Sequence, residues 1–193
     1  MARASLREKI LQEGLRVVHE KGFCASSVRD IVQAAGVPQG SFTNHFASKE
    51  AFGLDILNLY FENSLPLVHE TLLKDSKKPL KRLRAYIDAH KKMLNNGYVE
   101  KGCLYGNFTA EASEHSEMIR LRLVEIYDWL KECLEYCLKA AIAEKELPVD
   151  FPTKDVASFI LSSLQGAMLI GKADRDASTM RAFINVLFAN VLR

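Results

Sequence analysis

The 193-residue chain has only four cysteines, five prolines and one tryptophan. So few cysteines exclude a small scaffold stapled by disulfides. The ten glycines are an ordinary number, and 48% of the residues are hydrophobic. These values exclude a disordered or collagen-like chain, because enough apolar side chains are present to form a buried core. The length suits one large domain, or a small domain joined to a medium one.

A large excess of charge of one sign is also missing. The chain carries 26 Lys and Arg against 24 Asp and Glu, a net charge of +2. This balance excludes a uniformly basic nucleic-acid coat protein but leaves room for a local basic face. Residues 1–50 hold seven basic and five acidic side chains, while the other 143 residues hold 19 of each. The whole surplus therefore lies in the N-terminal quarter.

Long hydrophobic runs are scarce as well. The first ten residues lack the apolar run of roughly 7–15 residues that a secretory signal requires. The uncharged segment 156–171 has 16 residues, whereas a membrane span needs roughly 20 mostly apolar ones. We therefore expect a cytoplasmic protein with no membrane partner and a buried helix at 156–171. In a reducing compartment we expect the cysteines to be free thiols.

Residues that build metal or catalytic sites do not gather in the sequence. Cys133 and Cys137 lie four residues apart on an expected helix, but further soft or imidazole ligands at matching spacing are missing. We recognise no nucleophile–base pair, metal-ligand set or phosphate-binding loop. The sequence therefore predicts no catalytic residues, no metal and no cofactor. A helical-bundle carrier or enzyme for small molecules stays open as an alternative from another functional class.

Helical periodicity runs through nearly the whole chain, with almost no strand signal. Ser27 and Ser48 are suitable N-terminal caps, and Gly22 is placed to end the first helix. Breaks are clearest at Asn95-Asn96-Gly97 and at Leu147-Pro148. The expected helices cover about 5–21, 27–35, 38–46, 80–95, 106–112, 116–144, 153–172 and 178–191, with another starting at Ser48.

The turn Ala35-Gly36-Val37 between two short helices is typical of a helix-turn-helix. A small residue lets the helices pack closely, glycine takes the left-handed backbone, and a buried valine fixes the crossing angle. The second helix can then lie in the major groove of DNA. Its Gln and Asn side chains can bond adenine, its Thr can touch a thymine methyl, and its Gly allows close approach. The residues expected to contact DNA are Ser27, Arg29, Gln39, Gly40, Ser41, Thr43, Asn44, His45 and Lys49.

Phosphate contacts are expected from the basic residues around this motif. Arg29 and Lys49 are the candidates for gripping phosphates, with the hydroxyl of Ser27 beside them, while Arg3 and Arg7 can reach a groove or the backbone. Each of these side chains also fits a plain solvated surface. The predicted architecture is all-α, with an N-terminal three-helix helix-turn-helix DNA-binding domain at 1–47 and a helical-bundle ligand-binding and dimerisation domain at 48–193.

The run SVRDIVQAAGVPQGSFTNHFASKE, from Ser27 to Glu50, resembles the tetracycline-repressor (TetR/AcrR) family. The resemblance implies a homodimeric repressor that binds double-stranded palindromic operator DNA and is released by a small molecule. Two positions depart from the family pattern: Thr43 stands where the family usually has a tyrosine that touches the DNA backbone, and Gln39 where a lysine is frequent. Both changes remove reach or charge, which predicts weaker or different operator reading. An activator stays open beside a repressor.

The last two expected helices are apolar around most of their circumference. Their apolar residues are Phe159, Ile160, Leu164, Ala167, Met168 and Ile170 on one, and Phe183, Ile184, Val186, Leu187, Phe188 and Val191 on the other. A four-helix interface between two copies would bury both faces, as the family resemblance also implies. The alternative is a helix pair buried inside a monomer. Because two-fold DNA sites require two-fold proteins, we favour the homodimer.

The effector, of unknown identity, is expected in a mainly apolar cavity with a few polar groups. The segment 101–108 mixes glycines, aromatic residues and a thiol, and we expect it at the hinge between pocket and DNA-binding domain. The candidate pocket residues are Tyr86, His90, Cys103, Phe108, Trp129, Gln165 and Met168. For any single one, an ordinary role in the core is the alternative.

Cys103 supports a second hypothesis, in which the repressor senses oxidants or electrophiles through a reactive thiol. Lys101, or Lys172 from a later helix, could lower the pKa of that thiol and so favour the reactive thiolate. The alternative is an inert buried cysteine.

Overall fold

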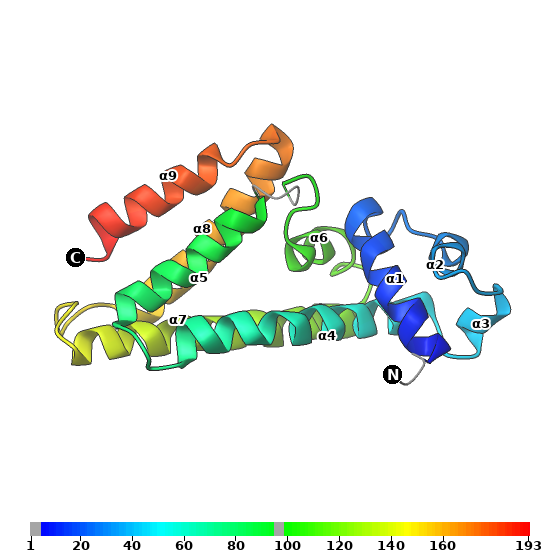
Figure 1. The fold of residues 1–193 in the computed structure, drawn as a ribbon, viewed down its shortest axis with the longest axis horizontal. Coiled ribbons are helices and arrows are strands. Elements are labelled where there is room, and N and C mark those ends of the chain that lie inside the picture. The colour runs from blue at the N-terminus through cyan, green and yellow to red at the C-terminus, as the bar shows by residue number, and fades with distance from the viewer. Residues whose placement is uncertain (1–4, 95–98) are drawn as a thin grey trace. The chain divides into compact units, whose positions relative to one another are not determined.

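The computed structural model describes residues 5–94 and 99–193, and within that part the chain is helical and has no β-strand (Figure 1). The helices are α1 (Leu6–Lys21), α2 (Val28–Ala34), α3 (Gly40–Thr43), α4 (Lys49–Val68), α5 (Pro79–Met93), α6 (Leu104–Glu111), α7 (Glu117–Ala143), α8 (Thr153–Asp174) and α9 (Ser178–Val186). Two π-helical turns, η1 (His69–Leu73) and η3 (Leu187–Val191), follow α4 and α9. The predicted all-α class is confirmed. The break predicted at 95–97 lies outside the described residues.

The chain folds into two compact units. The first comprises Met1–Asn63 with Leu104–Val124, and the second comprises Ser64–Cys103 with Glu125–Arg193. The first unit therefore holds α1 to α3, most of α4, all of α6 and the beginning of α7. A functional boundary at residue 47 stays a prediction.

Local sequence signals set the ends of α1. Ser5 and Glu8 form a capping box: the Ser5 hydroxyl accepts from the Glu8 amide at 3.2 Å, and the Ser5 amide donates to the Glu8 carboxylate at 2.8 Å. At the other end Gly22 has φ 89°, a conformation that strongly favours glycine. The predicted first helix is confirmed at both ends.

A cluster of phenylalanines forms the centre of the first unit. Phe42 of α3, Phe46 just after α3 and Phe52 of α4 are all buried, with ring centroids 4.9 to 5.2 Å apart. The helix predicted over 38–46 is shorter than expected, because α3 ends at Thr43 and the chain reaches Phe46 through a turn. Phe46 still turns inward, so the predicted inner pair is confirmed.

The α1 and α4 helices approach each other at Gly14. A Cβ atom on Gly14 would lie 2.3 Å from Cζ of Phe52, far inside van der Waals contact. The ring of Phe52 thus fills the space that a side chain on α1 would need. Glycine costs helix stability in such a position, and here the close packing of the aromatic ring offsets that cost.

In the second unit a buried arginine connects the start of α5 to α7. Arg82 is 2% exposed and pairs with the carboxylate of Asp75, which also accepts a hydrogen bond from the Tyr136 hydroxyl at 2.9 Å. The thiol of Cys137 donates to the carbonyl of Pro79 at 3.2 Å. Burial raises the pKa of the Cys137 and Cys133 thiols to about 11, which agrees with a structural role for both.

The α8 helix has a buried face and an exposed apolar face. Its buried residues are Val156, Ala157, Ile160, Leu161, Leu164, Ala167, Met168 and Gly171. On the other side Phe159 is 44%, Leu169 63% and Ile170 48% exposed, and on α9 Val186 is 50% exposed. By length and composition α8 could cross a membrane, a test that the core helix of a soluble protein also passes. Its buried face, packed in part against α9, favours a core helix.

Replacing Gly14 by alanine should destabilise the protein. The added methyl group collides with the Phe52 ring, and overpacking of this kind costs about 1–3 kcal/mol. The free energy of unfolding, measured in urea at fixed protein concentration, should fall by that amount.

Trimming the colliding ring supplies the matched control. Phe52→Leu destabilises by itself, but the Gly14→Ala/Phe52→Leu double variant should lose clearly less than the sum of the two single losses. Strictly additive losses would contradict the proposed contact.

Candidate nucleic-acid interface

The turn between α2 and α3 has the backbone that a helix-turn-helix requires. Gly36 has φ 60° and follows Ala35, which is 1% exposed. The amide of Val37 donates to the carbonyl of Val32 at 3.1 Å, which closes the turn. The predicted left-handed glycine is confirmed. Val37 is half-buried rather than fully buried, so Ala35 takes the closest packing position.

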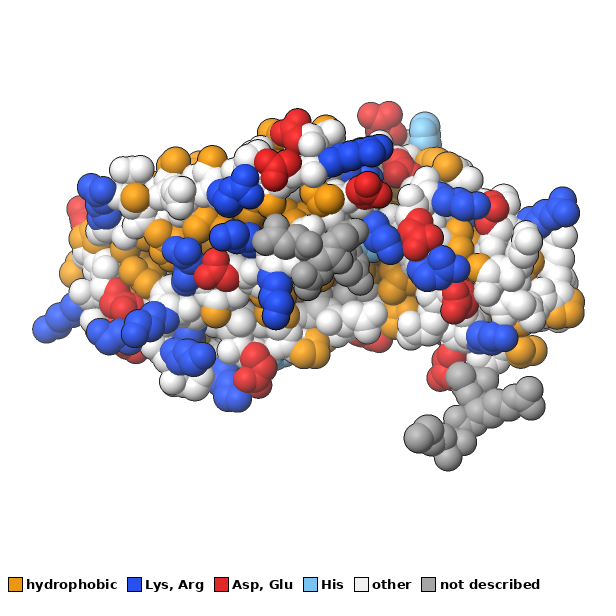
Figure 2. Space-filling view, turned by 45° about the horizontal axis from the view of Figure 1, so that its top comes forward, with side chains coloured by type: hydrophobic (Ala, Val, Ile, Leu, Met, Phe, Trp, Pro, Cys, Tyr) orange, Lys and Arg blue, Asp and Glu red, His pale blue; other side chains and the backbone are white. Residues whose placement is uncertain are grey.

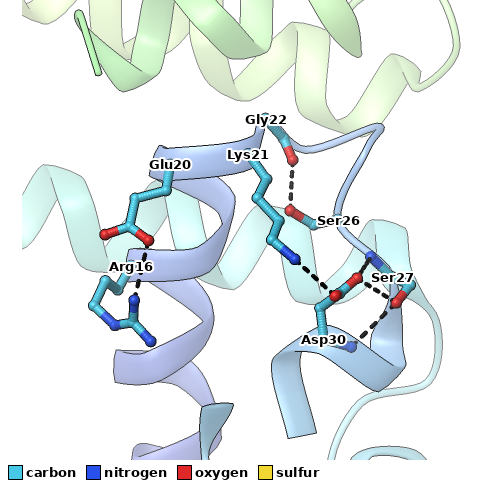
Figure 3. A network of polar contacts seen from close by, with 7 residues as sticks. All are labelled: Arg16, Glu20, Lys21, Gly22, Ser26, Ser27 and Asp30. Carbon is cyan, nitrogen blue, oxygen red and sulfur yellow. Dashed lines mark hydrogen bonds and ion pairs between the residues drawn. The ribbon is translucent and has the colours of Figure 1, made fainter. Parts of the chain in front are cut away.

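A compact network of polar contacts fixes the start of α2 (Figure 3). The amide of Ser27 donates to the Asp30 carboxylate at 2.9 Å, and the Asp30 amide donates to the Ser27 hydroxyl oxygen at 3.1 Å. Lys21, at the end of α1, reaches the same carboxylate at 2.8 Å. These contacts join the end of α1 to the start of α2, and therefore orient the helix-turn-helix.

The charge of Asp30 is stabilised by that network. Hydrogen bonding from Lys21, and then from Ser27, holds the pKa of the Asp30 carboxyl well below its usual range. The hydroxyl of Ser27 also donates to this carboxylate. Ser27 was predicted to contact DNA, and the structure gives it a capping role in addition.

The outer side of α3 presents a polar, uncharged surface. Phe42 and Phe46 turn inward, while the predicted DNA-contacting residues Gln39, Gly40, Thr43, Asn44 and His45 are exposed and Ser41 is half-buried. Residues four apart on a helix share a face, which places Gln39 with Thr43 and Gly40 with Asn44. The structure thus brings these residues together, and their contact with DNA stays a prediction.

Two details describe that surface more closely. The hydroxyl of Thr43 donates to the carbonyl of Gly40 at 3.1 Å, within the helix. Around Gly40, a Cβ atom would find no other residue within 4 Å. The space beside Gly40 is therefore open, and no packing contact among the described residues requires a glycine at this position.

Several basic side chains near this surface are engaged within the protein. The ammonium group of Lys49 donates to the carbonyl of Cys24 at 3.1 Å and lies 4.9 Å from the centre of the Phe23 ring. Arg7 pairs with Asp55 at 2.6 Å and lies over Phe46. Both connect α4 to other parts of the first unit. The predicted phosphate contact of Lys49 is untested.

Two other basic residues of the first unit are available. Lys9 and Arg29 are exposed, and their side chains make no hydrogen bond or ion pair within the described residues. The Lys9 ammonium lies 3.8 Å from the position of a Cβ on Gly36, beside the helix-turn-helix turn. Sequence reasoning did not select Lys9, because only the packing of α1 places it there. Arg3 lies outside the described residues.

One face of the molecule carries charges of both signs. On the face shown in Figure 2, basic and acidic side chains are interspersed, and neither sign forms a continuous field. This agrees with the nearly balanced composition. Attraction to DNA would therefore depend on a few local basic groups.

The residues predicted to line an effector pocket fall into both units. Phe108 belongs to the first unit, where its ring centroid lies 4.9 Å from that of Phe23. In the second unit Tyr86 is buried against His90, with ring centroids 4.6 Å apart. Burial lowers the pKa of His90, which favours the neutral form of its ring. The pocket itself stays a prediction.

Cys103 also belongs to the second unit. The amide of Gln165 donates to its sulfur at 3.4 Å. Of the remaining predicted residues, Met168 is buried and Trp129 is half-buried. A surface depression of about 200 Å³ between α7 and α8 contains none of the predicted residues; it is lined by Asp128, Lys131, Glu132, Glu135, Lys154, Ala157 and Ser158. Within the described residues, no three His, Cys, Asp or Glu side chains are placed to hold a metal ion.

Replacing Asp30 by asparagine should destabilise the protein in a pH-dependent way. A carboxyl whose folded-state pKa is lowered adds stability above its unfolded pKa, and that stability is lost as the pH falls through the folded value. The difference in unfolding free energy between wild type and Asp30→Asn should therefore be present at pH 7 and smaller at pH 3.

Asp150→Asn is the matched control, because Asp150 is exposed and has no ion pair or hydrogen bond within the described residues. Urea unfolding followed by circular dichroism measures both variants. A difference for Asp30→Asn that does not shrink at pH 3 would argue against the charged network.

The sequence matches family models and known relatives over both halves of the chain. The model of the bacterial regulatory proteins, tetR family, matches residues 10–55, and the model of the tetracyclin repressor-like C-terminal domain matches residues 79–187. The HTH-type transcriptional repressor DhaR of Mycobacterium sp. (strain GP1) is 35% identical over 193 residues, which cover 100% of this chain and 95% of DhaR. The transcriptional regulator AcuR of Cereibacter sphaeroides is 28% identical over 177 residues, covering 91% of this chain and 80% of AcuR.

Solved structures agree with these matches. The regulatory protein TetR from Rhodobacter sphaeroides superimposes with a TM-score of 0.88 at 27% identity, over 94% of this chain and 97% of that one. The reduced form of E. coli NemR shares the fold, with a TM-score of 0.84 at 24% identity over 93% of both chains. Family models match both halves of the chain, and a relative matches along the whole of it, which shows that the chain belongs to the TetR family of bacterial transcriptional regulators.

Proposed function

We propose that this chain is a ligand-responsive transcriptional repressor that binds a palindromic operator as a homodimer and leaves it when a small molecule binds the second unit. The observation that carries the proposal is the exposed polar surface of α3, held outward by Phe42 and Phe46 on a helix-turn-helix. The repressor relative DhaR, similar over the whole chain, supports the direction of regulation. As a regulator of this family, the protein acts in the cytoplasm and not as an enzyme.

The contacts to DNA are divided between bases and phosphates. In this proposal Gln39, Gly40, Ser41, Thr43, Asn44 and His45 face the major groove. Arg29 contacts phosphates, and Lys9 joins it because its ammonium lies beside the turn. Ser27 and Lys49 support the interface through their internal contacts and reach the DNA backbone at its edge.

The homodimer is proposed to form through α8 and α9. Phe159, Leu169 and Ile170 on α8 and Val186 on α9 are large apolar side chains that a single chain leaves exposed. Two copies related by a two-fold axis would bury these side chains in a four-helix interface, and the dimer would carry two copies of α3. Successive major grooves lie roughly 34–36 Å apart, and the dimer would span them.

The effector is proposed to bind in the domain beyond residue 47. Tyr86, His90 and Trp129 offer aromatic surface, Met168 offers a flexible apolar side chain and Gln165 an amide. Cys103 completes the proposed set within the second unit. A neutral His90 suits a site of low polarity, since burial disfavours its charged form. The effector would stabilise a conformation in which the two α3 helices no longer match the grooves.

Binding to the DNA upstream of the gene that encodes this chain tests the proposal. A gel shift should show saturable binding that resists non-specific competitor, and a screen of small molecules should find one that releases the DNA. Binding that disappears with competitor at every salt concentration would overturn the proposal.

The same assay tests the phosphate contacts. The slope of the logarithm of the binding constant against the logarithm of the salt concentration is negative, and each lost phosphate contact makes it shallower by about 0.9. Because a dimer loses two contacts, Arg29→Ala or Lys9→Ala should make the slope shallower by about 1.8. Lys139→Ala is the control: Lys139 is exposed in the second unit and pairs with Glu135 at 2.9 Å, and its loss should leave the slope unchanged. An unchanged slope in both test variants would contradict the assigned contacts.

A thiol-sensing repressor is a second candidate, favoured by one observation. The sulfur of Cys103 accepts a hydrogen bond from the Gln165 amide, which stabilises negative charge on sulfur. Cys133 and Cys137 are buried with raised pKa values, so Cys103 is a better candidate for a reactive thiol than either of them.

Labelling with a soft electrophile, followed by mass spectrometry, separates the two candidates. A sensing thiol predicts modification of Cys103 in the native protein and loss of operator binding, with Cys103→Ser retaining binding after the same treatment. If Cys103 resists modification in the native dimer, the thiol hypothesis fails and the non-covalent effector remains.

A further inference from the structure

The outward surface of α3 belongs to a long segment without charge. From Ile31 to Ser48 the sequence contains no Lys, Arg, Asp or Glu. Guanine is most often read in the major groove by Arg or Lys, which donate to its O6 and N7 atoms. The basic residues that flank this segment are Arg29 and Lys49, and the ammonium of Lys49 is held by the carbonyl of Cys24. The surface of α3 therefore lacks the side chains most often used to read guanine.

Thr43 presents a methyl group on the same surface. Its hydroxyl is committed to the carbonyl of Gly40 at 3.1 Å, yet the residue is exposed. The γ-methyl is the other branch of the side chain, and it is left for contact with a ligand. In the major groove, apolar contact with a protein methyl group is a way of recognising the C5-methyl of thymine.

Two amides and an open backbone lie beside this methyl group. Gln39 and Asn44 are exposed, and their side chains make no hydrogen bond within the described residues. Such amides can pair with N6 and N7 of adenine, through one donor and one acceptor. No neighbour among the described residues lies within 4 Å of a Cβ position on Gly40, so a base edge can approach the backbone there. His45, the remaining polar residue, follows the end of α3 and contacts the edge of Phe46.

We infer that α3 reads A·T base pairs: Thr43 contacts the methyl group of a thymine, and Gln39 and Asn44 bond adenines. The positions of each half-site beneath α3 are therefore A·T pairs, with a thymine methyl as a required feature. This inference rests on the proposed function and adds to it the class of base pair that the protein recognises.

Selection of bound fragments from a random DNA library, with the full-length protein, tests the base-pair inference separately from the proposed repressor function. Enrichment of a palindrome with A·T pairs at the centre of each half-site supports the inference. Enrichment of a palindrome with G·C pairs there overturns the inference and leaves the repressor proposal intact. No enriched sequence at all overturns both.

Replacing thymine by deoxyuridine in the selected site then tests the methyl contact, because it removes only the C5-methyl group. Burial of one methyl group corresponds to about a fourfold change in affinity. At the position that Thr43 contacts, deoxyuridine should therefore weaken wild-type binding about fourfold for each half-site that carries it. At other positions of the site, the same replacement should change the affinity little.

Two variants of Thr43 assign that effect to its methyl group. Thr43→Ser keeps the hydroxyl and loses the methyl, so its affinity should no longer distinguish thymine from deoxyuridine. Thr43→Val keeps a methyl and loses the hydroxyl, so it should distinguish them as the wild type does. Because Thr43 is exposed, both variants should unfold at the wild-type temperature. A Thr43→Ser protein with the full wild-type preference for thymine would overturn the assignment.

Discussion

The position of the DNA-facing side chains depends on the packing of one phenylalanine. The ring of Phe52 fills the space opposite Gly14 and touches both Phe42 and Phe46. Because these two residues are held inward, the three residues between them face outward. Apolar packing beneath the surface therefore sets the direction of the helix-turn-helix, while the polar residues on its outer side can differ between relatives without disturbing the core.

The second constraint is the small number of basic side chains in the first unit that are free to contact DNA phosphates. Several basic side chains of the first unit form contacts within that unit. Lys21 of α1 pairs with Asp30 of α2, Lys49 of α4 donates to the carbonyl of Cys24 after α1, and Arg7 of α1 pairs with Asp55 of α4. Exposed polar contacts of this kind contribute little stability each, but each of them engages a cationic group within the protein. A DNA-binding surface with few free cations depends more on base contacts than on phosphate attraction, which suits a regulator that must dissociate from DNA.

Several helix boundaries could be predicted from the sequence because their causes are local. Ser5, Ser27 and Gly22 act within a few residues of their own positions, and the structure places a helix end at each. The inclusion of α6 in the first unit could not be predicted from the sequence, because it depends on contacts between distant segments of the chain. The Glu111 carboxylate accepts from the Cys24 amide at 3.0 Å, across 87 positions of sequence. For the same reason Lys9 was not selected, and the aromatic residues proposed for the pocket could not be told from core residues by periodicity.

Two helices run without a break from one unit into the other, and they differ in stiffness. α7 contains neither proline nor glycine over its 27 residues, so it is a continuous rod. α4 contains Pro66, just beyond the unit boundary at Asn63, and ends in the π-helical turn η1. Proline cannot donate to the carbonyl four residues earlier, which weakens a helix at that point. Within the first unit, Glu111 fastens α6 to the turn that follows α1. Bending of α4 is therefore expected near Pro66, whereas the 27 residues of α7 include no position weakened in this way.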